Sequence, residues 1–546
     1  MNADDRFEEF CQEMLNKFLE KNPDWATFLG LHEPYDYLLP NGSTQALLEN
    51  LQLLEESIKR LNETMRKEEL NEDNRINWDV IEKAHERFKF AFHERRMHEL
   101  NPDAFEEIAG LIYTMFTRDY APMEKRVDAI AARIEKAPEF LQEFRSRFER
   151  SQPVRLWTEM AIETAQNIGG LLQFIVQATK GKVPKEIHQR LEKAIEGFQP
   201  AFKRHMEWLN SLLPRAKEEW ALGADKFEKL LRIRELGMTS NEIYELGARY
   251  LRELKAERER LAYQIAPGKS TEEVVKMIES NAPKTFEEAL EFTRKTVEEA
   301  RRFVQEKNIA TVYPEDILLV QETPAYLTPV IPFAALVTPA KFDKPQIGNY
   351  IVTRPKDPRN LGKHLNYARI INTAIHEAFP GHFLQTAVSN RGSFVHQLAR
   401  GTETIEGWAH YCEEMMIEKG FATDLETRLM QVNKMIWRAV RVIIDVKLSR
   451  GEMTFEEAIE LLVREADISR DAANAEVKRY TQTPSYQLSY LLGKHLILQL
   501  KEEVKQKMGD RFDDKLFHDT ITANGYLPVS ILRKIFDRKA RNPEFS

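Results

Sequence analysis

The sequence is poor in cysteine and has no long hydrophobic run. Its 546 residues include 2 cysteines, too few for a disulfide framework, which favours a reducing compartment. No stretch approaches the ~20 apolar residues of a membrane-spanning helix. The charged start, Met1 to Glu9, lacks the apolar core of a signal peptide. These absences predict a cytoplasmic protein with no membrane partner.

A strong charge of one sign is also absent. The formal net charge is -8, both signs are interspersed, and no basic block is present, so nucleic acid is not an expected partner. With 42% hydrophobic residues the chain can bury a large core. No Pro/Gly/Ser-rich linker divides it. We therefore expect a single unit over 1–546, with a mainly helical half at 1–309 and a second half at 310–546.

Amphipathic helical periodicity dominates the chain. Leucine and isoleucine recur at helical spacing from Leu47 to Leu61, with Glu and Lys between them. Similar patterns run through 76–99, 122–149, 185–212, 226–264, 271–279 and 285–308. Caps followed by acids are expected at Ser270, Thr285 and Thr454. The sequence predicts a mostly α fold.

A proline-rich region, 310–355, breaks this pattern and predicts one small β-sheet. Ile317–Val320 and Gly348–Thr353 have the β-branched, apolar character of short strands. An exposed edge strand can hold an extended peptide through backbone hydrogen bonds. Gly348, Asn349 and Tyr350 are therefore candidate substrate-binding residues.

The segment directly after this region carries the clearest chemical pattern. It reads His-Glu-Ala-Phe-Pro-Gly-His from His376 to His382, and Glu406 follows 24 positions later in Glu-Gly-Trp-Ala-His-Tyr. Two histidines and a carboxylate can bind a catalytic zinc ion and leave a fourth position open for water. Glu377, beside the first histidine, can act as the general base.

The spacing of the two histidines is unusual. In the common zinc-binding helix they are four residues apart, whereas His376 and His382 are six apart. On a regular helix, six residues correspond to about 240° of rotation and ~9 Å of rise, so the two side chains could not reach one ion. Pro380 and Gly381 predict a local bulge that absorbs two residues. The alternative is that Pro380 ends a helix and the histidines are ordinary polar residues.

Glu406 is expected on the next helix, with Glu403, His410 and Glu413 on the same face. Glu406 would be the third ligand, and His410 or Glu413 would orient a ligand through a hydrogen bond. The alternative is a solvated acidic face. Three other His-Glu pairs occupy polar contexts typical of a surface, and they begin at His32, His85 and His93, the last followed by His98.

The two motifs together resemble a widespread prokaryotic family described mainly as a domain of unknown function and treated as zinc metallopeptidases. The arrangement of its expected metal ligands and base is similar to that of the gluzincin-type carboxypeptidase Taq, neurolysin-like and angiotensin-converting-enzyme groups. Weaker resemblance extends to the blocks 23–30, 324–350, 483–490 and 517–528. Before the glutamine, the family often has Pro-Gly where this chain has Thr483-Pro484-Ser485-Tyr486. The resemblance implies that His376, His382 and Glu406 bind one zinc ion per chain.

Other candidate roles are less specific. Tyr490, and after it Tyr486, are candidate donors to the oxyanion, although either could be an ordinary core aromatic. Arg479 can bind a terminal carboxylate or form a surface salt bridge. The resemblance alone places Asp36 and Tyr37 on the far wall of a substrate groove.

The sequence therefore predicts a large helical metallopeptidase that hydrolyses short peptides in a deep groove, with Glu377 as base. Cobalt, manganese or another divalent metal could replace zinc. A metal-dependent amidase with a non-peptide substrate is an alternative. A helical binding protein with an inactive site is another, although the presence of Glu377 argues against it. The type of peptide end attacked and the oligomeric state have no signal in the sequence.

Overall fold

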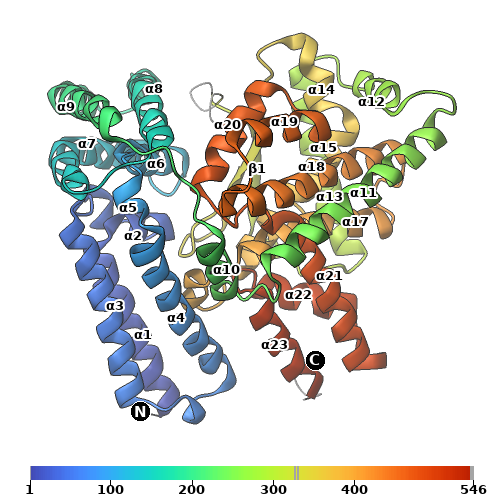
Figure 1. The fold of residues 1–546 in the computed structure, drawn as a ribbon, viewed down its shortest axis with the longest axis horizontal. Helices are drawn as coiled ribbons and strands as arrows, with labels where there is room; N and C mark the ends of the chain where they lie inside the picture. The colour runs from blue at the N-terminus through green and yellow to red at the C-terminus, as the bar shows by residue number, and fades with distance from the viewer. Residues whose placement is uncertain (1, 325–327, 329–330, 332, 542–546) are drawn as a thin grey trace. The chain divides into compact units, whose positions relative to one another are not determined.

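A computed structural model describes residues 2–324, 328, 331 and 333–541 and consists mainly of α-helices (Figure 1). The predicted mostly α fold with one small sheet is confirmed. The chain forms two compact units. The first comprises Met1–Trp220 with Ala340–Asp343, and the second comprises Ala221–Pro339 with Lys344–Ser546. The predicted division at 309 separated regions of different secondary structure, whereas the compact units divide near Trp220.

The helices of the first unit follow the amphipathic segments of the sequence. They are α1 (Ala3–Lys21), α2 (Pro23–Leu29), α3 (Thr44–Thr64), α4 (Glu72–Phe90), α5 (Met97–Leu100), α6 (Ala104–Thr117), α7 (Met123–Arg145), α8 (Arg155–Thr179) and α9 (Lys185–Leu212). The predicted helix at 76–99 is shorter than expected. It ends at Phe90, a π-helical turn follows, and Arg96 adopts a left-handed backbone with φ 54°.

The core of the first unit is rich in aromatic side chains packed between α6, α7 and α9. His205 of α9 is buried here, with its ring centroid 5.0 Å from that of Phe105 and 4.7 Å from that of Trp208. Asp36 is also buried and accepts hydrogen bonds from Thr27 Oγ1 and Tyr120 Oη, each at 2.6 Å. These bonds and its burial hold Asp36 inside the first unit, and its place on the wall of a substrate groove stays a prediction. Tyr37 packs against the same core.

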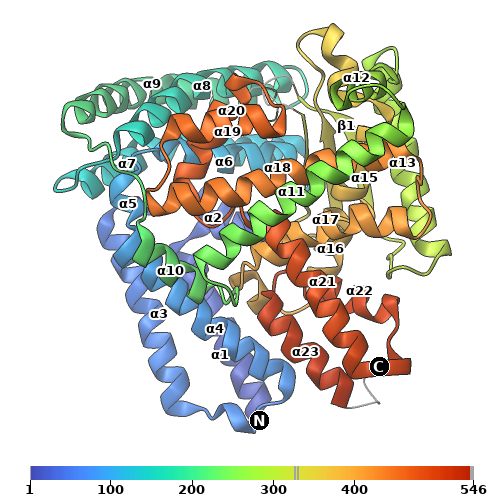
Figure 2. The same ribbon diagram turned by 45° about the vertical axis from the view of Figure 1, so that its right-hand side comes forward.

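The second unit contains the remaining helices and the sheet. Its helices are α10 (Ala224–Ile233), α11 (Ser240–Ile265), α12 (Thr271–Ser280), α13 (Phe286–Glu306), α14 (Leu361–Leu365), α15 (Tyr367–Glu377), α16 (His382–Ser389), α17 (Thr402–Glu418), α18 (Leu425–Arg450), α19 (Phe455–Ala466), α20 (Arg470–Gln482), α21 (Ser489–Met508), α22 (Asp514–Ala523) and α23 (Val529–Arg541). The long helices α11 and α18 lie side by side (Figures 1 and 2).

The predicted caps and one predicted helix have different outcomes. Ser270, Thr285 and Thr454 each accept a hydrogen bond from a backbone N–H of the first helical turn, as expected. The segment 226–264, however, forms two helices. Between them Glu235 and Gly237 adopt positive φ values of 55° and 71°, which a continuous helix does not allow.

The sheet has three strands in the order β1-β3-β2: β1 (Ile317–Glu322), β3 (Ile347–Val352) and β2 (Ala334–Val337). β3 is parallel to β1 and antiparallel to β2. The two predicted strands are present as β1 and β3, but β3 is the central strand. Its backbone pairs with β1 over Ile347–Val352 and with β2 over Asn349–Val352. These pairs occupy most of the backbone groups that were expected to bind a substrate peptide.

Two glycines bring α17 and α21 into close contact. A Cβ atom at Gly407 of α17 would lie 2.3 Å from the carbonyl carbon of Gly493 in α21. A Cβ atom at Gly493 would lie 2.0 Å from the carbonyl oxygen of Glu403. Only glycine permits this approach at either position. The contact fixes the helix that carries Glu406 against the helix that carries Tyr490.

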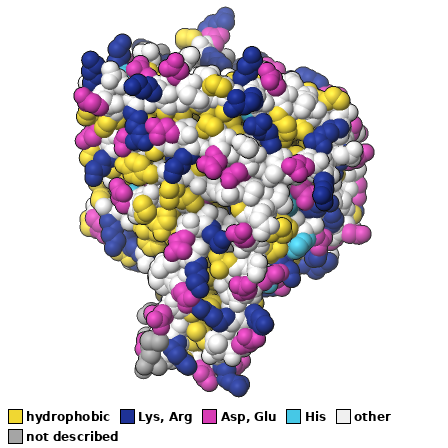
Figure 3. Space-filling model, turned by 90° about the vertical axis from the view of Figure 1, so that its left-hand side faces the viewer, with side chains coloured by type: hydrophobic (Ala, Val, Ile, Leu, Met, Phe, Trp, Pro, Cys, Tyr) yellow, Lys and Arg dark blue, Asp and Glu magenta, His cyan; other side chains and the backbone are white. Residues whose placement is uncertain are grey.

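The surface is mixed in charge. Figure 3 shows Lys and Arg interspersed with Asp and Glu across the displayed face, with apolar side chains between them. Over the described ranges, no helix has both the length and the apolar character needed to cross a bilayer.

Candidate metal centre

The two histidines lie at the ends of two consecutive helices. His376 is in the last turn of α15, which ends at Glu377, and His382 is the first residue of α16. Residues 378–381 join them in a widened turn. The N–H of Gly381 donates to the carbonyl of Ile375 at 3.1 Å, and the N–H of Leu384 donates to that of Ala378 at 3.3 Å. Both bonds span six residues, where an α-helix spans four. The predicted bulge is therefore a break between two helices.

Gly381 and Trp408 stabilise this turn. A Cβ atom at Gly381 would lie 1.9 Å from the carbonyl oxygen of His376, so the turn requires glycine. The indole Nε1 of Trp408 donates a hydrogen bond of 2.8 Å to the carbonyl of Pro380, and its side chain is fully buried. A buried carbonyl without such a partner would cost about 1–3 kcal/mol. Trp408 thus links the turn to α17, the helix that carries Glu406.

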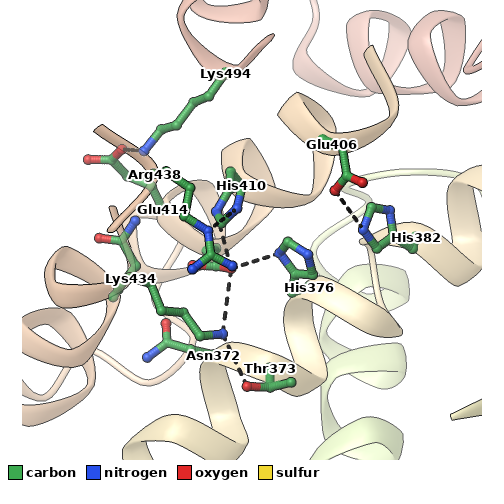
Figure 4. Close-up of polar contacts among 12 residues, drawn as sticks. Asn372, Thr373, His376, His382, Glu406, His410, Glu414, Lys434, Arg438 and Lys494 are labelled. Atoms are coloured by element: carbon green, nitrogen blue, oxygen red, sulfur yellow. Dashed lines mark hydrogen bonds and ion pairs between the residues drawn. The ribbon is translucent and has the colours of Figure 1, made fainter. Parts of the chain in front are cut away.

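His376, His382 and Glu406 converge (Figure 4). One potential ligand atom from each lies within 4.8 Å of the other two. Nε2 of His382 is 3.6 Å from Oε2 of Glu406. Two ligands about 2.0–2.2 Å from a tetrahedral zinc ion are separated by about 3.4 Å, so this pair already has a suitable spacing. The structure brings together the three residues that the sequence selected.

Glu413 orients His376. Its Oε1 is 2.8 Å from Nδ1 of His376, which turns Nε2 of the ring toward the other two candidate ligands. Burial raises the pKa of this carboxyl, but Lys434 and His410 outweigh it and hold the pKa well below its usual range. Nζ of Lys434 is 3.7 Å from Oε1. A charged carboxylate that accepts from the second nitrogen of a histidine ligand is a common device at zinc sites.

A second group of potential ligands shares His376 and adds His410 and Glu413. One contact argues against a metal there. Nε of Arg438 donates to Nε2 of His410 at 3.1 Å, so a neutral ring carries its proton on Nδ1. That nitrogen faces Oε1 of Glu413 at 3.4 Å and has no lone pair left for a metal. The pKa of His410 is well below its usual value, chiefly because of burial, and a neutral ring can accept this bond. The group containing His382 and Glu406 therefore fits a metal ion better.

Glu406 is held in its charged form. Burial raises its pKa, but His382, His376 and Tyr486 lower it to about 2. The hydroxyl of Tyr486 donates to Oε1 at 2.8 Å, while Oε2 faces His382. For His382, burial lowers the pKa but the neighbouring Glu406 carboxylate outweighs it, so the pKa is raised. A deprotonated, anchored carboxylate with one oxygen directed at a histidine is suited to a divalent cation.

Buried polar residues position the loop of Tyr486. Oδ1 of Asp445 accepts from the N–H of Ser485 at 2.8 Å, and Oδ2 accepts from the N–H of Leu488 at 2.9 Å. Arg234 donates to the carbonyl of Ser485 and, at 2.8 Å, to Oε2 of Glu403. Ser485 adopts a left-handed φ of 67°, the conformation that glycine prefers.

The remaining candidates lie at different places around the centre. Glu377 is half-buried at the end of α15 and interacts electrostatically with His376, His382 and Tyr350. Tyr490 packs its ring 6.0 Å from that of Tyr486 and 5.8 Å from that of His410.

The residues expected to bind substrate are held within the fold or on its surface. A Cβ atom at Gly348 would lie 2.6 Å from the Phe383 ring, so this glycine permits packing on α16. Asn349 accepts from Gln321 at 2.9 Å. Arg479 donates to Glu476 at 3.0 Å, as a salt bridge would require. Its guanidinium carbon also lies 6.0 Å from the ring centroid of Tyr486.

The other His-Glu pairs contribute to different structure. His32 pairs with Asp36 at 3.0 Å, and His98 stacks on Phe92. Within the ranges that the structure describes, His85 and His93 belong to no group that could hold a metal.

Sequence reasoning missed the charged stripe of α18. Its members are Lys434, Arg438, Arg441 and Asp445, which contact Glu413, His410, Glu476 and the Tyr486 loop, respectively. Their spacing of four, three and four residues places them on one helix face, inside an otherwise apolar segment. Charged residues at helical spacing within an apolar segment could have indicated that this face of α18 lies against other buried charged groups.

The chain belongs to the family described as "Bacterial protein of unknown function (DUF885)", whose model matches residues 23–535. No curated protein matches the sequence significantly. Two solved structures are similar in fold. One is a proposed lipoprotein of unknown function from Shewanella oneidensis, with 24% identity, 97% of this chain and 99% of that chain covered, and a TM-score of 0.79. The other is a proposed lipoprotein from Colwellia psychrerythraea, with 18% identity, coverage of 99% and 100%, and a TM-score of 0.86.

Proposed function

We propose that this protein is a mono-zinc metallopeptidase of the gluzincin type that hydrolyses short peptides. The convergence of His376, His382 and Glu406, with Glu377 next to the first of them, carries the proposal. The bond from His376 to Glu413 supports it, since it directs Nε2 toward the proposed ion.

The donor set fits zinc. It offers two imidazoles and one charged carboxylate, and it leaves room in a tetrahedral arrangement for one exchangeable ligand. A zinc ion held in this way lowers the pKa of water toward ~7 and polarises a carbonyl oxygen. Cobalt or manganese can be bound by the same donors.

The chain supplies the proton transfers. The Glu377 carboxylate takes a proton from the attacking water and returns it to the nitrogen of the leaving amine. Tyr486 already donates its hydroxyl proton to Glu406 and stabilises that residue in its charged form. We therefore assign Tyr490 as the donor to the oxyanion that develops on the substrate carbonyl. Loss of one such donor costs about 2.7–4 kcal/mol of the activation barrier where it has been measured.

The first experiment is zinc content after exhaustive dialysis of wild type, His382→Ala and Glu406→Ala. We expect about one zinc per chain in the wild type and strong loss in both variants, with helicity retained. His93→Ala is the matched control, because His93 is an exposed histidine that also precedes a glutamate. Wild-type zinc content in the two site variants would contradict the proposal.

The second experiment is hydrolysis of a peptide library, with Glu377→Gln as the inactive control. We expect cleavage by the wild type and a loss of at least about 100-fold in the variant. Cleavage of simple amides in place of peptides would identify the amidase alternative. Zinc binding with no cleavage of either class would identify a binding protein.

A further inference from the structure

Three guanidinium groups gather on one side of the candidate metal centre. Arg438 and Arg441 come from α18, and Arg479 comes from the end of α20. Arg441 and Arg479 share one carboxylate, because Oε2 of Glu476 accepts from Nη2 of Arg441 at 2.7 Å and from Nη2 of Arg479 at 3.0 Å. Arg438 donates to the neutral ring of His410. Positive charge therefore exceeds negative charge in this cluster.

Lys434 does not change this balance. Its ammonium group lies beside Glu413, so that pair is neutral overall. The same Oε2 of Glu476 also accepts the hydroxyl of Tyr480 at 2.6 Å, which leaves it little capacity for a third cation. Nη1 of Arg438 is buried without a hydrogen-bond partner. Buried positive charge without a counter-charge is unfavourable, so the cluster is suited to an anionic ligand.

Two tyrosines separate the arginines from the candidate ligands. The guanidinium carbon of Arg441 lies 4.9 Å from the ring centroid of Tyr490, and that of Arg438 lies 5.7 Å from it. The guanidinium carbon of Arg479 lies 6.0 Å from the ring centroid of Tyr486, whose hydroxyl binds Glu406. The arginine cluster is thus one aromatic ring away from the candidate ligand set.

Arg479 is the accessible member of this cluster. Its side chain is 41% exposed, whereas that of Arg441 is 5% exposed. A guanidinium group carries five N–H donors in a planar fork that matches a carboxylate. An incoming carboxylate can therefore reach Arg479, while Arg438 and Arg441 supply positive potential behind it.

We propose that Arg479, with Arg438 and Arg441 behind it, binds the C-terminal carboxylate of the peptide substrate. This inference rests on the proposed peptidase function. The guanidinium carbon of Arg479 lies 6.0 Å from the ring centroid of Tyr486, whose hydroxyl binds the candidate ligand Glu406. A carboxylate bound by Arg479 is therefore close in space to the candidate ligands, so the enzyme removes residues from the C-terminus.

The test compares tetrapeptide libraries that differ only in the C-terminal group, free carboxylate or amide. We expect the wild type to cleave the free acids several-fold more efficiently than the amides, because an amide offers no negative charge to the Arg479 guanidinium. Arg479→Gln should abolish this preference through a higher KM, with kcat little changed. Arg479→Lys should restore part of it. Arg470→Gln is the matched control, because Arg470 lies on the same helix, is exposed and pairs with Glu456.

A binding measurement separates this inference from the proposed function. Zinc-loaded Glu377→Gln protein is immobilised, and retention of the two libraries is compared by mass spectrometry. Selective retention of free acids that is lost with the additional change Arg479→Gln would support the carboxylate site even without turnover. Equal retention, or retention of neither library, would overturn it. Equal cleavage of acids and amides by the wild type would also overturn it, while leaving the peptidase proposal intact.

Discussion

Oε1 of Glu413 lies 2.8 Å from Nδ1 of His376, and both side chains are buried in the second unit. This bond selects the tautomer of His376 that presents Nε2 to a metal ion. The same carboxylate lies 3.7 Å from the ammonium group of Lys434. Glu413 therefore links ligand orientation to the charge balance around it.

Glu413→Gln should lower zinc affinity by about 10- to 100-fold, because an amide orients the histidine less strongly and cannot balance Lys434. Competition with a chromogenic chelator measures the effect. Glu418→Gln, an exposed change at the end of the same helix, should leave the affinity unchanged. An unchanged affinity in Glu413→Gln would mean that His376 is not a metal ligand.

Trp408→Phe removes the donor to the Pro380 carbonyl while keeping an aromatic ring in place. We expect a loss of about 1–3 kcal/mol in the free energy of unfolding, because the carbonyl remains buried. Zinc affinity should also fall, since the turn that spaces the two histidines loosens. Trp78→Phe, in the core of the first unit, should affect stability but not zinc binding. Urea unfolding and zinc titration give the two readouts.

Ser485→Gly should stabilise the protein by about 1 kcal/mol. Ser485 adopts φ 67°, which costs an L-residue roughly 1–2 kcal/mol, and glycine avoids most of this cost. Ser43→Gly is the control, because Ser43 has φ -75° and caps α3, so the same change should not stabilise it. A fall in thermal stability of Ser485→Gly would show that the serine side chain contributes more than the backbone costs.

His205 should make the protein less stable in acid. Burial lowers its folded-state pKa to about 3 from an ordinary value of 6.5, so the unfolded chain binds the proton more readily. The neutral His205 therefore costs the protein no stability above pH 6.5. Below pH 6.5 the free energy of unfolding falls as the pH drops toward 3. The loss from this residue is about 2 kcal/mol at pH 5, at 1.36 kcal/mol per pKa unit.

His205→Phe should remove that part of the pH dependence, since phenylalanine suits the surrounding aromatic rings and does not titrate. Urea unfolding of both proteins at pH 8 and pH 5 measures the difference. If the two proteins lose the same free energy between these pH values, His205 does not titrate as expected.

Local signals in the sequence predicted much of the fold. Periodicity identified most of the long helices, and proline spacing identified the small sheet. The order of its strands was not predictable, because β1 and β3 alone do not reveal that β2 completes the sheet on the far side of β3. For that reason the sequence suggested a free strand edge where the structure has a central strand.

The candidate centre was predictable as a set of residues but not as a geometry. Nothing local indicates that Arg438 donates to His410 or that Asp445 holds the loop of Tyr486, because these contacts join segments 28 and 40 residues apart. Pro380 and Gly381 indicated a departure from regular helix, but they predicted a bulge within one helix where the structure has a break between α15 and α16. The role of Trp408 in it depends on the close packing of α17 against the preceding segment, which only the tertiary structure defines.

The turn at 378–381 also interrupts the helical periodicity of the sequence between α15 and α16. Two residues on a regular helix correspond to about 200° of rotation, so an uninterrupted count from α15 would assign the residues of α16 to the wrong side. Because the turn separates α15 from α16, the positions of His376 and His382 relative to each other are set by the turn and not by a helical count. The buried and exposed faces of α15 and α16 therefore have to be assigned separately, each from a residue within its own helix.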